Sequence, residues 1–323
     1  RLLKFFGVIA SQATSPERME CVEVLIGFLL TWCQSKEYAT RWRSCQILGS
    51  LVNNVPEDMS DAVAEQVEEI TLLLLEDGKP TVRAAAVKAL TRFPQPDEDG
   101  NFKGCKVVGA LLKVLRHDNS KEVRKAILSA IPSSPVTFKA LVERTRDESD
   151  DVRRMAYNML AEKALVTDVE MVDLAILLSR GILDRSAPVS QAAKNLVVSW
   201  FDGCEGEPLA LLQHIDASQH VEAAELTVKA LLSTERVDAC QVATMAAENG
   251  LGLRAAYGNG EVSLMSPEEA LFWRVVCEYL ASEASSHGLA AANTGGANVP
   301  LRTLTFPNSP YQCCRPTSRT PFG

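Results

Sequence analysis

An Asp followed five residues later by a Val recurs along this chain, each time just ahead of a segment rich in Ala and larger apolar residues. The copies are Asp77–Val82, Asp118–Val123, Asp147–Val152, Asp184–Val189 and Asp216–Val221, and Glu37–Trp42 is a degenerate further copy. Successive Val (or Trp) positions lie 40, 41, 29, 37 and 32 residues apart. Such a period is typical of arrays that stack pairs of helices, in which each repeat contacts only its neighbours.

The segment after each Val carries apolar residues at helical spacing. Val82, Ala86, Ala89 and Leu90 would share one face of a helix, and such a face must be buried against a neighbour. Alternating β-branched runs bounded by hairpin turns are missing from the sequence. We therefore predict an all-α fold, an α-solenoid of stacked helix pairs with an armadillo-like superhelical course.

Three copies place an Arg directly after the Val, six residues beyond the Asp. The pairs are Asp77 with Arg83, Asp118 with Arg124, and Asp147 with Arg153. An Asp in the turn before a helix can accept hydrogen bonds from exposed backbone N–H groups, and an Arg one turn into that helix can reach the Asp of a neighbouring repeat. This arrangement resembles the Asp and Arg ladder of HEAT repeats, so we assign these six residues a structural role between repeats.

Charge is unevenly distributed along the chain. Lys79 to Lys194 contains 20 Lys and Arg residues and 15 Asp and Glu residues, a net charge of +5, whereas the rest of the chain carries −13. Lys and Arg side chains on one surface can bind DNA phosphates through the release of counterions. The basic residues that the repeat does not explain are the candidate contacts for DNA or a partner protein, namely Lys79, Lys88, Arg92, Lys121, Lys125, Arg146 and Arg154.

Catalytic and ligand-binding motifs are missing from the sequence. It has no Gly-rich phosphate loop, no GxSxG elbow and no kinase-type set, so we expect no enzymatic activity, no cofactor and no small-molecule substrate. His and Cys spacings do not suit a metal site, and the four Trp residues lie in apolar helical patterns that predict core packing.

The nine cysteines include no CxxC pair, which predicts reduced thiols in a nuclear or cytosolic protein. The apolar runs are too short to span a membrane, so we expect no membrane partner. Because Arg1 lies within an apolar helical pattern, we expect residues 1–283 to be an internal part of a longer solenoid. Residues 284–323 are rich in Ala, Ser, Gly, Asn, Pro and Thr, and we expect them to form a disordered tail.

Four segments resemble the condensin complex subunit 3 family and occur in that family's order. They are Arg41–Leu48, Met155–Lys163, Gly181–Ser186 and Ser266–Leu280, and the resemblance covers about residues 1–282. It implies a non-catalytic HEAT-repeat subunit that joins a kleisin and, through it, a pair of SMC ATPases. It also implies binding of double-stranded DNA without sequence specificity on the concave side, in support of mitotic chromosome condensation.

The resemblance further implies a nuclear and chromosomal location, with a cytoplasmic pool in interphase. The chain departs from the family in lacking its first repeats and in ending in the low-complexity tail instead of further repeats. The alternative is a HEAT adaptor of another process, such as nuclear transport or a phosphatase scaffold, which would bind protein and never DNA. Steep salt dependence of duplex binding would separate the two.

Overall fold

The computed structural model describes residues 1–56, 59–239 and 266–293, and it places the residues in two compact units, Arg1–Leu280 and Ala281–Gly323. The described residues are helical and include no β-strand. The α-helices are α1 (Leu2–Ser11), α2 (Pro16–Cys33), α3 (Tyr38–Val52), α4 (Asp61–Leu74), α5 (Pro80–Ala89), α6 (Lys106–His117), α7 (Lys121–Ala130), α8 (Pro135–Arg144), α9 (Asp150–Lys163), α10 (Met171–Ile182), α11 (Ala187–Gly203), α12 (Pro208–Ile215), α13 (Val221–Ser233) and α16 (Pro267–Asn293). Two short 3₁₀ helices, Leu90–Arg92 and Val166–Asp168, follow α5 and α9.

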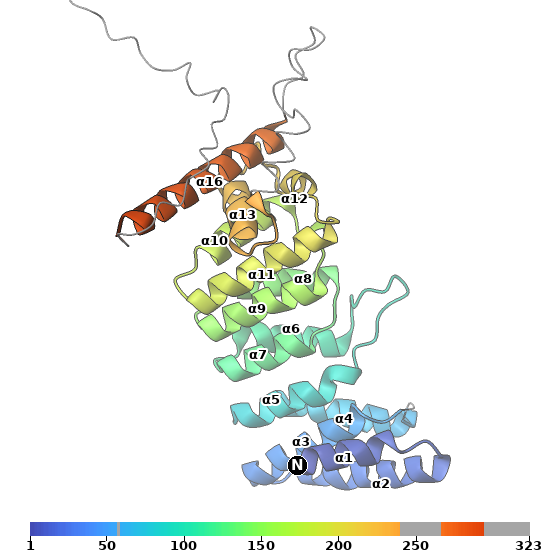
Figure 1. Ribbon diagram of the computed structural model, residues 1–323. Helices are drawn as coiled ribbons and strands as arrows, with labels where there is room; N and C mark the ends of the chain where they lie inside the picture. Colours follow the sequence, from blue (N-terminus) through green and yellow to red (C-terminus); the bar gives the residue numbers. More distant parts are fainter. Residues whose placement is uncertain (57–58, 240–265, 294–323) are drawn as a thin grey trace, which may run out of the picture. The chain divides into compact units, whose positions relative to one another are not determined.

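The helices of the first unit form two rows (Figure 1). The second helices of successive pairs, α3, α5, α7, α9 and α11, pack against one another in sequence order, and α1 packs on α3 at one end of this row. The first helix of each pair packs against its own second helix, as α4 does on α5 and α8 on α9. The α-solenoid predicted from the sequence is confirmed by this arrangement.

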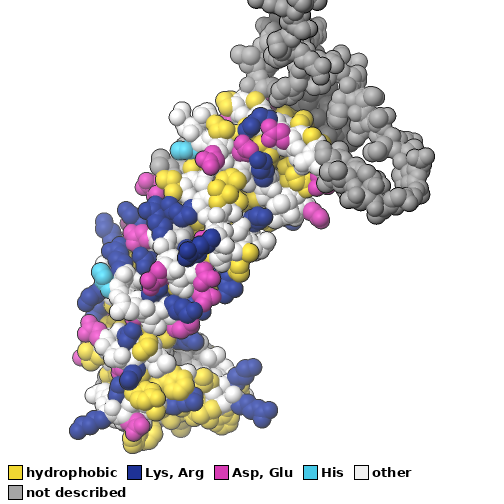
Figure 2. Space-filling view, turned by 90° about the vertical axis from the view of Figure 1, so that its left-hand side faces the viewer, with side chains coloured by type: hydrophobic (Ala, Val, Ile, Leu, Met, Phe, Trp, Pro, Cys, Tyr) yellow, Lys and Arg dark blue, Asp and Glu magenta, His cyan; other side chains and the backbone are white. Residues whose placement is uncertain are grey.

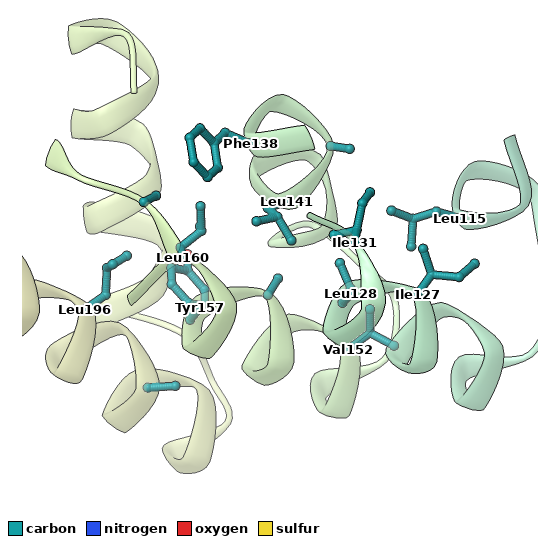
Figure 3. Close-up of a cluster of buried hydrophobic side chains, with 14 of the residues drawn as sticks. Leu115, Ile127, Leu128, Ile131, Phe138, Leu141, Val152, Tyr157, Leu160 and Leu196 are labelled. Atoms are coloured by element: carbon teal, nitrogen blue, oxygen red, sulfur yellow. The ribbon is translucent and has the colours of Figure 1, made fainter. Parts of the chain in front are cut away.

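The core is a continuous apolar layer between the two rows. Figure 3 shows part of it, where Ile127 and Leu128 of α7 lie near Leu141 of α8, and Tyr157 of α9 lies near Leu196 of α11. These five side chains are almost fully buried. Burying one large apolar side chain stabilises a fold by about 1.5–3 kcal/mol, so the stacked apolar faces hold the array together.

Two glycines set how closely neighbouring helices approach. A Cβ atom on Gly49 of α3 would lie 3.2 Å from the Ala89 Cα of α5, and one on Gly181 of α10 would lie 2.5 Å from the Tyr157 ring. Any larger residue at Gly181 would displace the Tyr157 ring, whose hydroxyl donates a 2.9 Å hydrogen bond to the Leu177 carbonyl oxygen.

Two sequence-based expectations need correction. We predicted a disordered tail from residue 284, but α16 continues to Asn293, because its Ala-rich end extends an existing helix at little cost in free energy. Residues 294–323 lie outside the described part. We also predicted that Trp32 packs in the core, as Trp200 does, but Trp32 is 47% exposed beside Phe28 on α2. The spacing of apolar residues does not reveal which part of a wide apolar face a neighbour covers.

Candidate functional site

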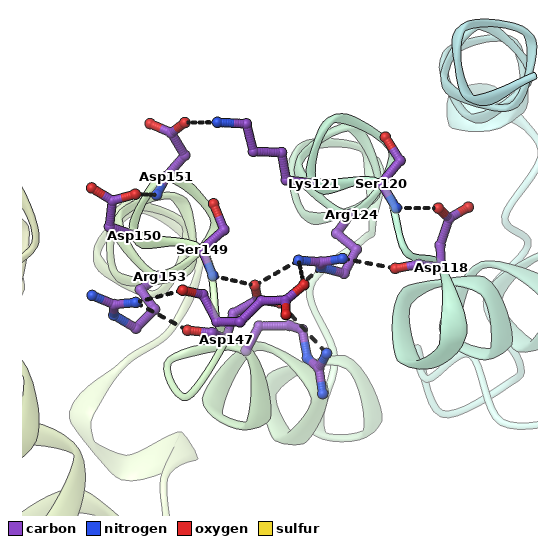
Figure 4. Close-up of polar contacts among 11 residues, drawn as sticks. Asp118, Ser120, Lys121, Arg124, Asp147, Ser149, Asp150, Asp151 and Arg153 are labelled. Atoms are coloured by element: carbon purple, nitrogen blue, oxygen red, sulfur yellow. Dashed lines mark hydrogen bonds and ion pairs between the residues drawn. The ribbon is translucent and has the colours of Figure 1, made fainter.

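A ladder of ion pairs runs across the turns between first and second helices. Arg83 donates from Nε and Nη2 to the Asp118 carboxylate at 2.6 and 2.8 Å, and Arg124 donates in the same way to Asp147 at 2.8 and 2.8 Å. Arg153 makes the next pair at 2.8 and 2.9 Å, with Asp184. Each rung therefore ties one repeat to the following one by a bidentate pair, the strongest geometry between these groups. Figure 4 shows the rung between Arg124 and Asp147.

The same side chains also order the turns. Nη1 of each Arg donates to the carbonyl oxygen six residues earlier, as from Arg124 to Asp118 at 2.7 Å. Each Asp accepts the N–H of the residue two positions later, as Asp118 does from Ser120 at 2.7 Å. Burial alone would raise the pKa of Asp118, but these hydrogen bonds and the charge of Arg83 outweigh it and hold that pKa below its ordinary value.

The register of the first copy differs from our prediction. We aligned Glu37–Trp42 with the repeat, but Arg41 makes the ladder contact, donating to Asp77 at 2.6 and 3.2 Å and to the Ser35 carbonyl oxygen at 2.8 Å. Ser35 therefore stands where later repeats have Asp, and the copy begins two residues earlier than we predicted. Ser35 still accepts the N–H of Glu37 at 3.3 Å, as each Asp does from the residue two positions later, but it has no carboxylate, so the Asp pattern could not identify this position in the sequence.

The ladder ends at Asp184. The residue six positions after it is Ser190, which has no charge and donates instead to the Ile182 carbonyl oxygen at 2.8 Å. The next Asp of the pattern, Asp216, accepts hydrogen bonds from Ser218 and Gln219 in its own turn. No Arg therefore joins the repeat of α10 and α11 to that of α12 and α13 through this position.

Three of the predicted DNA or kleisin contacts lie together on the solvent-exposed face of α7 and α9. Lys121 bridges the two helices by an ion pair with Asp151 at 2.9 Å, and Arg154 approaches the same carboxylate at 3.5 Å. Lys125 pairs with Glu122 at 3.4 Å on its own helix. The hydrogen bond from Lys121 raises its pKa, so it stays fully charged near neutral pH.

The remaining candidates differ in their surroundings. Lys79 lies over the Tyr38 ring, 5.7 Å from its centroid, while Lys88 is exposed on α5 and forms no ion pair with any residue of the described part. Arg92 donates to the carbonyl oxygens of Val52 and Val55, at 3.2 and 2.7 Å, where α3 ends.

Arg146 lies apart from the α7 and α9 group. It lines a polar pocket of about 610 Å3, together with Lys139 and Arg144. Figure 2 shows Lys and Arg side chains gathering over the middle of the first unit, interspersed with Asp and Glu. The positive charge of this region is thus partly balanced by neighbouring carboxylates.

The described ranges contain no group of three or more His, Cys, Asp and Glu side chains placed to hold a metal ion. No helix in that part of the chain is long and apolar enough to cross a membrane.

Comparison with known proteins places these features in context. A model of HEAT repeats matches residues 67–161, and a model of a HEAT-like repeat matches residues 39–93. Condensin complex subunit 3 of Homo sapiens is 34% identical over 266 residues, which cover 80% of this chain and 25% of the relative. The Xenopus laevis protein of the same name is 31% identical, over 88% of this chain and 27% of the relative.

A solved structure of the S. pombe condensin Cnd3-Cnd2 subcomplex has the same fold. It matches with a TM-score of 0.70 at 24% sequence identity, over 88% of this chain and 35% of that chain. The present chain thus spans about a quarter of the length of the curated relatives and about a third of the solved chain.

Proposed function

The chain belongs to the condensin complex subunit 3 family, and we propose that it is part of a HEAT-repeat subunit that binds a kleisin and double-stranded DNA in condensin. Through the kleisin it would join the SMC ATPase pair, act on mitotic chromosomes without chemistry of its own, and reside in the nucleus and on chromosomes, with a cytoplasmic pool in interphase. The name of the S. pombe structure, which describes a condensin subcomplex of two proteins, supports the proposal of a protein partner.

The observation that carries the DNA proposal is the succession of cations along the row of second helices. Lys88 lies on α5, Lys121 and Lys125 on α7, and Arg154 on α9, and these three helices pack side by side. Lys88 forms no ion pair with any described residue, and the other three cations pair with solvent-accessible carboxylates, whose ion pairs contribute little because water and salt screen them. A phosphate can therefore replace each carboxylate, and contacts to phosphate carry no sequence preference.

The test is the salt dependence of binding to a labelled DNA duplex, measured by fluorescence anisotropy. The test variant reverses the charge of Lys88, Lys121, Lys125 and Arg154. Arg92 is left intact because it holds the end of α3, so its loss would disturb the fold. We expect weaker binding and a slope of log affinity against log salt that is shallower by up to about 3–4.

The matched control reverses four exposed cations on α6 and in the turn before it, Lys103, Lys106, Lys113 and Arg116, which changes the net charge by the same amount. Equal weakening in both variants would show that net charge, and not this surface, drives binding. Unchanged binding in the test variant would refute the surface assignment. Pull-down of the kleisin's central region tests the protein partner separately, and kleisin or other protein binding without DNA binding would favour a protein-only adaptor.

A further inference from the structure

A groove lies where the ladder of ion pairs ends, between α10 and α13. The groove between α10 and α13 has a volume of about 940 Å3 and is lined by both turns that the missing rung would have joined, residues 183–185 and 219–221. The first helix of the last pair, α12, has only 8 residues, so α10 packs against α13 as well as α12. In the earlier copies the second helix starts three residues after the Asp position, but α13 starts five residues after Asp216, whose φ of 53° is left-handed.

The groove is lined by large apolar side chains that remain substantially exposed. Ile176 and Leu183 of the α10 segment are 42% and 62% exposed, and Val221 at the start of α13 is 47% exposed. Ile176 and Leu183 lie seven residues apart, which places them about 10 Å from one another along the helix direction. Apolar side chains gathered in one concave site are typical of surfaces that receive a partner.

The charged residues of the groove are mostly basic. Arg180 and Arg185 form no ion pair with any residue that the structure describes, whereas Arg153 and Asp184 are engaged with each other in the last rung. Glu222 and His220 lie on the α13 side, and Glu222 is the exposed carboxylate there. Burial and the nearby charge of Arg146 lower the pKa of Arg180 more than Tyr157 and Asp173 raise it, so an incoming anion would help to stabilise the Arg180 charge.

We propose that the groove between α10 and α13 binds a short acidic peptide segment of a partner protein, with large apolar side chains resting on Ile176, Leu183 and Val221 and carboxylates paired with Arg180 and Arg185. Such a segment would place its anchors about two helical turns apart, as helix-in-groove ligands do. This inference goes beyond the proposed function, since it requires neither DNA nor kleisin.

The test is selection of phage-displayed random peptides on the whole chain, followed by fluorescence polarisation of the enriched peptides. We expect them to combine acidic with large apolar residues. Their affinity should fall about tenfold or more in Leu183→Glu and again in Arg185→Glu, because each change removes a contact and adds a like charge. Both side chains are exposed, so the variants should fold as the parent does.

The matched controls are Leu165→Glu, an apolar side chain 63% exposed after α9, and Lys113→Glu, an exposed cation on α6. These variants should bind the selected peptides as the parent does. Equal loss in the controls, enrichment of peptides without acidic residues, or no enrichment of any peptide sensitive to Leu183→Glu would each overturn the proposal. A failure of DNA or kleisin binding would not affect this result, so the two proposals fail separately.

Discussion

Replacing Asp147 by Asn should destabilise the array at its most buried rung. The side chains of Arg124 and Asp147 are 5% and 2% exposed, so solvent cannot replace the contacts that are lost. Asp147 accepts two hydrogen bonds from Arg124 and one from the Ser149 N–H at 2.9 Å. Asn keeps the shape and one carbonyl oxygen, but it loses the charge and the second acceptor.

The expected loss is about 3 kcal/mol in the free energy of unfolding. Removing one partner of a buried ion pair costs about 3–5 kcal/mol, because the other charge is left without compensation. We expect the lower end, since Arg124 keeps its hydrogen bond to the Asp118 carbonyl oxygen and a 3.2 Å contact with Glu148.

Urea denaturation followed by circular dichroism measures the total loss, and hydrogen exchange locates it, because repeat arrays do not always unfold in one step. The amide of Ser149 and those early in α9 should exchange faster in Asp147→Asn. The control is Asp151→Asn, which removes the exposed pair with Lys121 and should change stability far less. An equal loss in the free energy of unfolding for the two substitutions would refute the argument that burial makes the Arg124–Asp147 pair more stabilising than an exposed pair.

Three further outcomes follow from the packing and the ladder. Gly181→Ala should cost about 1–3 kcal/mol in thermal or urea unfolding, because the new methyl group would overlap the Tyr157 ring and the Ala193 Cβ atom, and a neutral effect would contradict the tight packing of α10 at this glycine. Trp200→Phe should cost about 1–3 kcal/mol, since the Ala164 carbonyl oxygen loses its 2.9 Å hydrogen bond. A Trp200→Tyr variant, which keeps a donor, would contradict this reason if it were no more stable than Trp200→Phe. The free energy of unfolding should also fall in acid, because hydrogen bonds and charge from Arg lower the pKa values of three ladder carboxyls below the ordinary Asp value. The stability that these carboxyls contribute is fully present above the ordinary pKa and is lost as the pH drops through the lowered pKa. These carboxyls belong to Asp77, Asp118 and Asp184. Urea titrations from neutral pH to about pH 3 measure the loss, and an Arg83→Met variant with the same pH profile as the parent would count against the role of Asp118.

The sequence by itself determined the repeating helix pair. A helix pair with an exposed apolar face is not stable alone, so the recurring Asp and Val spacing with its apolar segments is enough to predict a stacked array. The six-residue offset from Asp to Arg likewise follows from local geometry: it places the carboxylate in the turn and the guanidinium one helical turn inside, beside the next repeat. Family membership was indicated by segments such as Arg41–Leu48 that the repeat itself does not require.

Only the tertiary structure decided which neighbour each side chain meets. Arg41 and Asp184 take part in the ladder because the stacking of repeats brings their turns next to those of their partners. Arg92 donates to a carbonyl oxygen at the end of α3 instead of forming part of an open basic surface. Lys121 of α7 gained a carboxylate partner, Asp151, on the adjacent helix α9. The groove between α10 and α13 formed where a short helix and a missing Arg left apolar side chains exposed. The spacing of residues along a chain reveals local periodicity, whereas the pairing of ladder residues and the burial of side chains depend on contacts between residues that lie twenty or more positions apart.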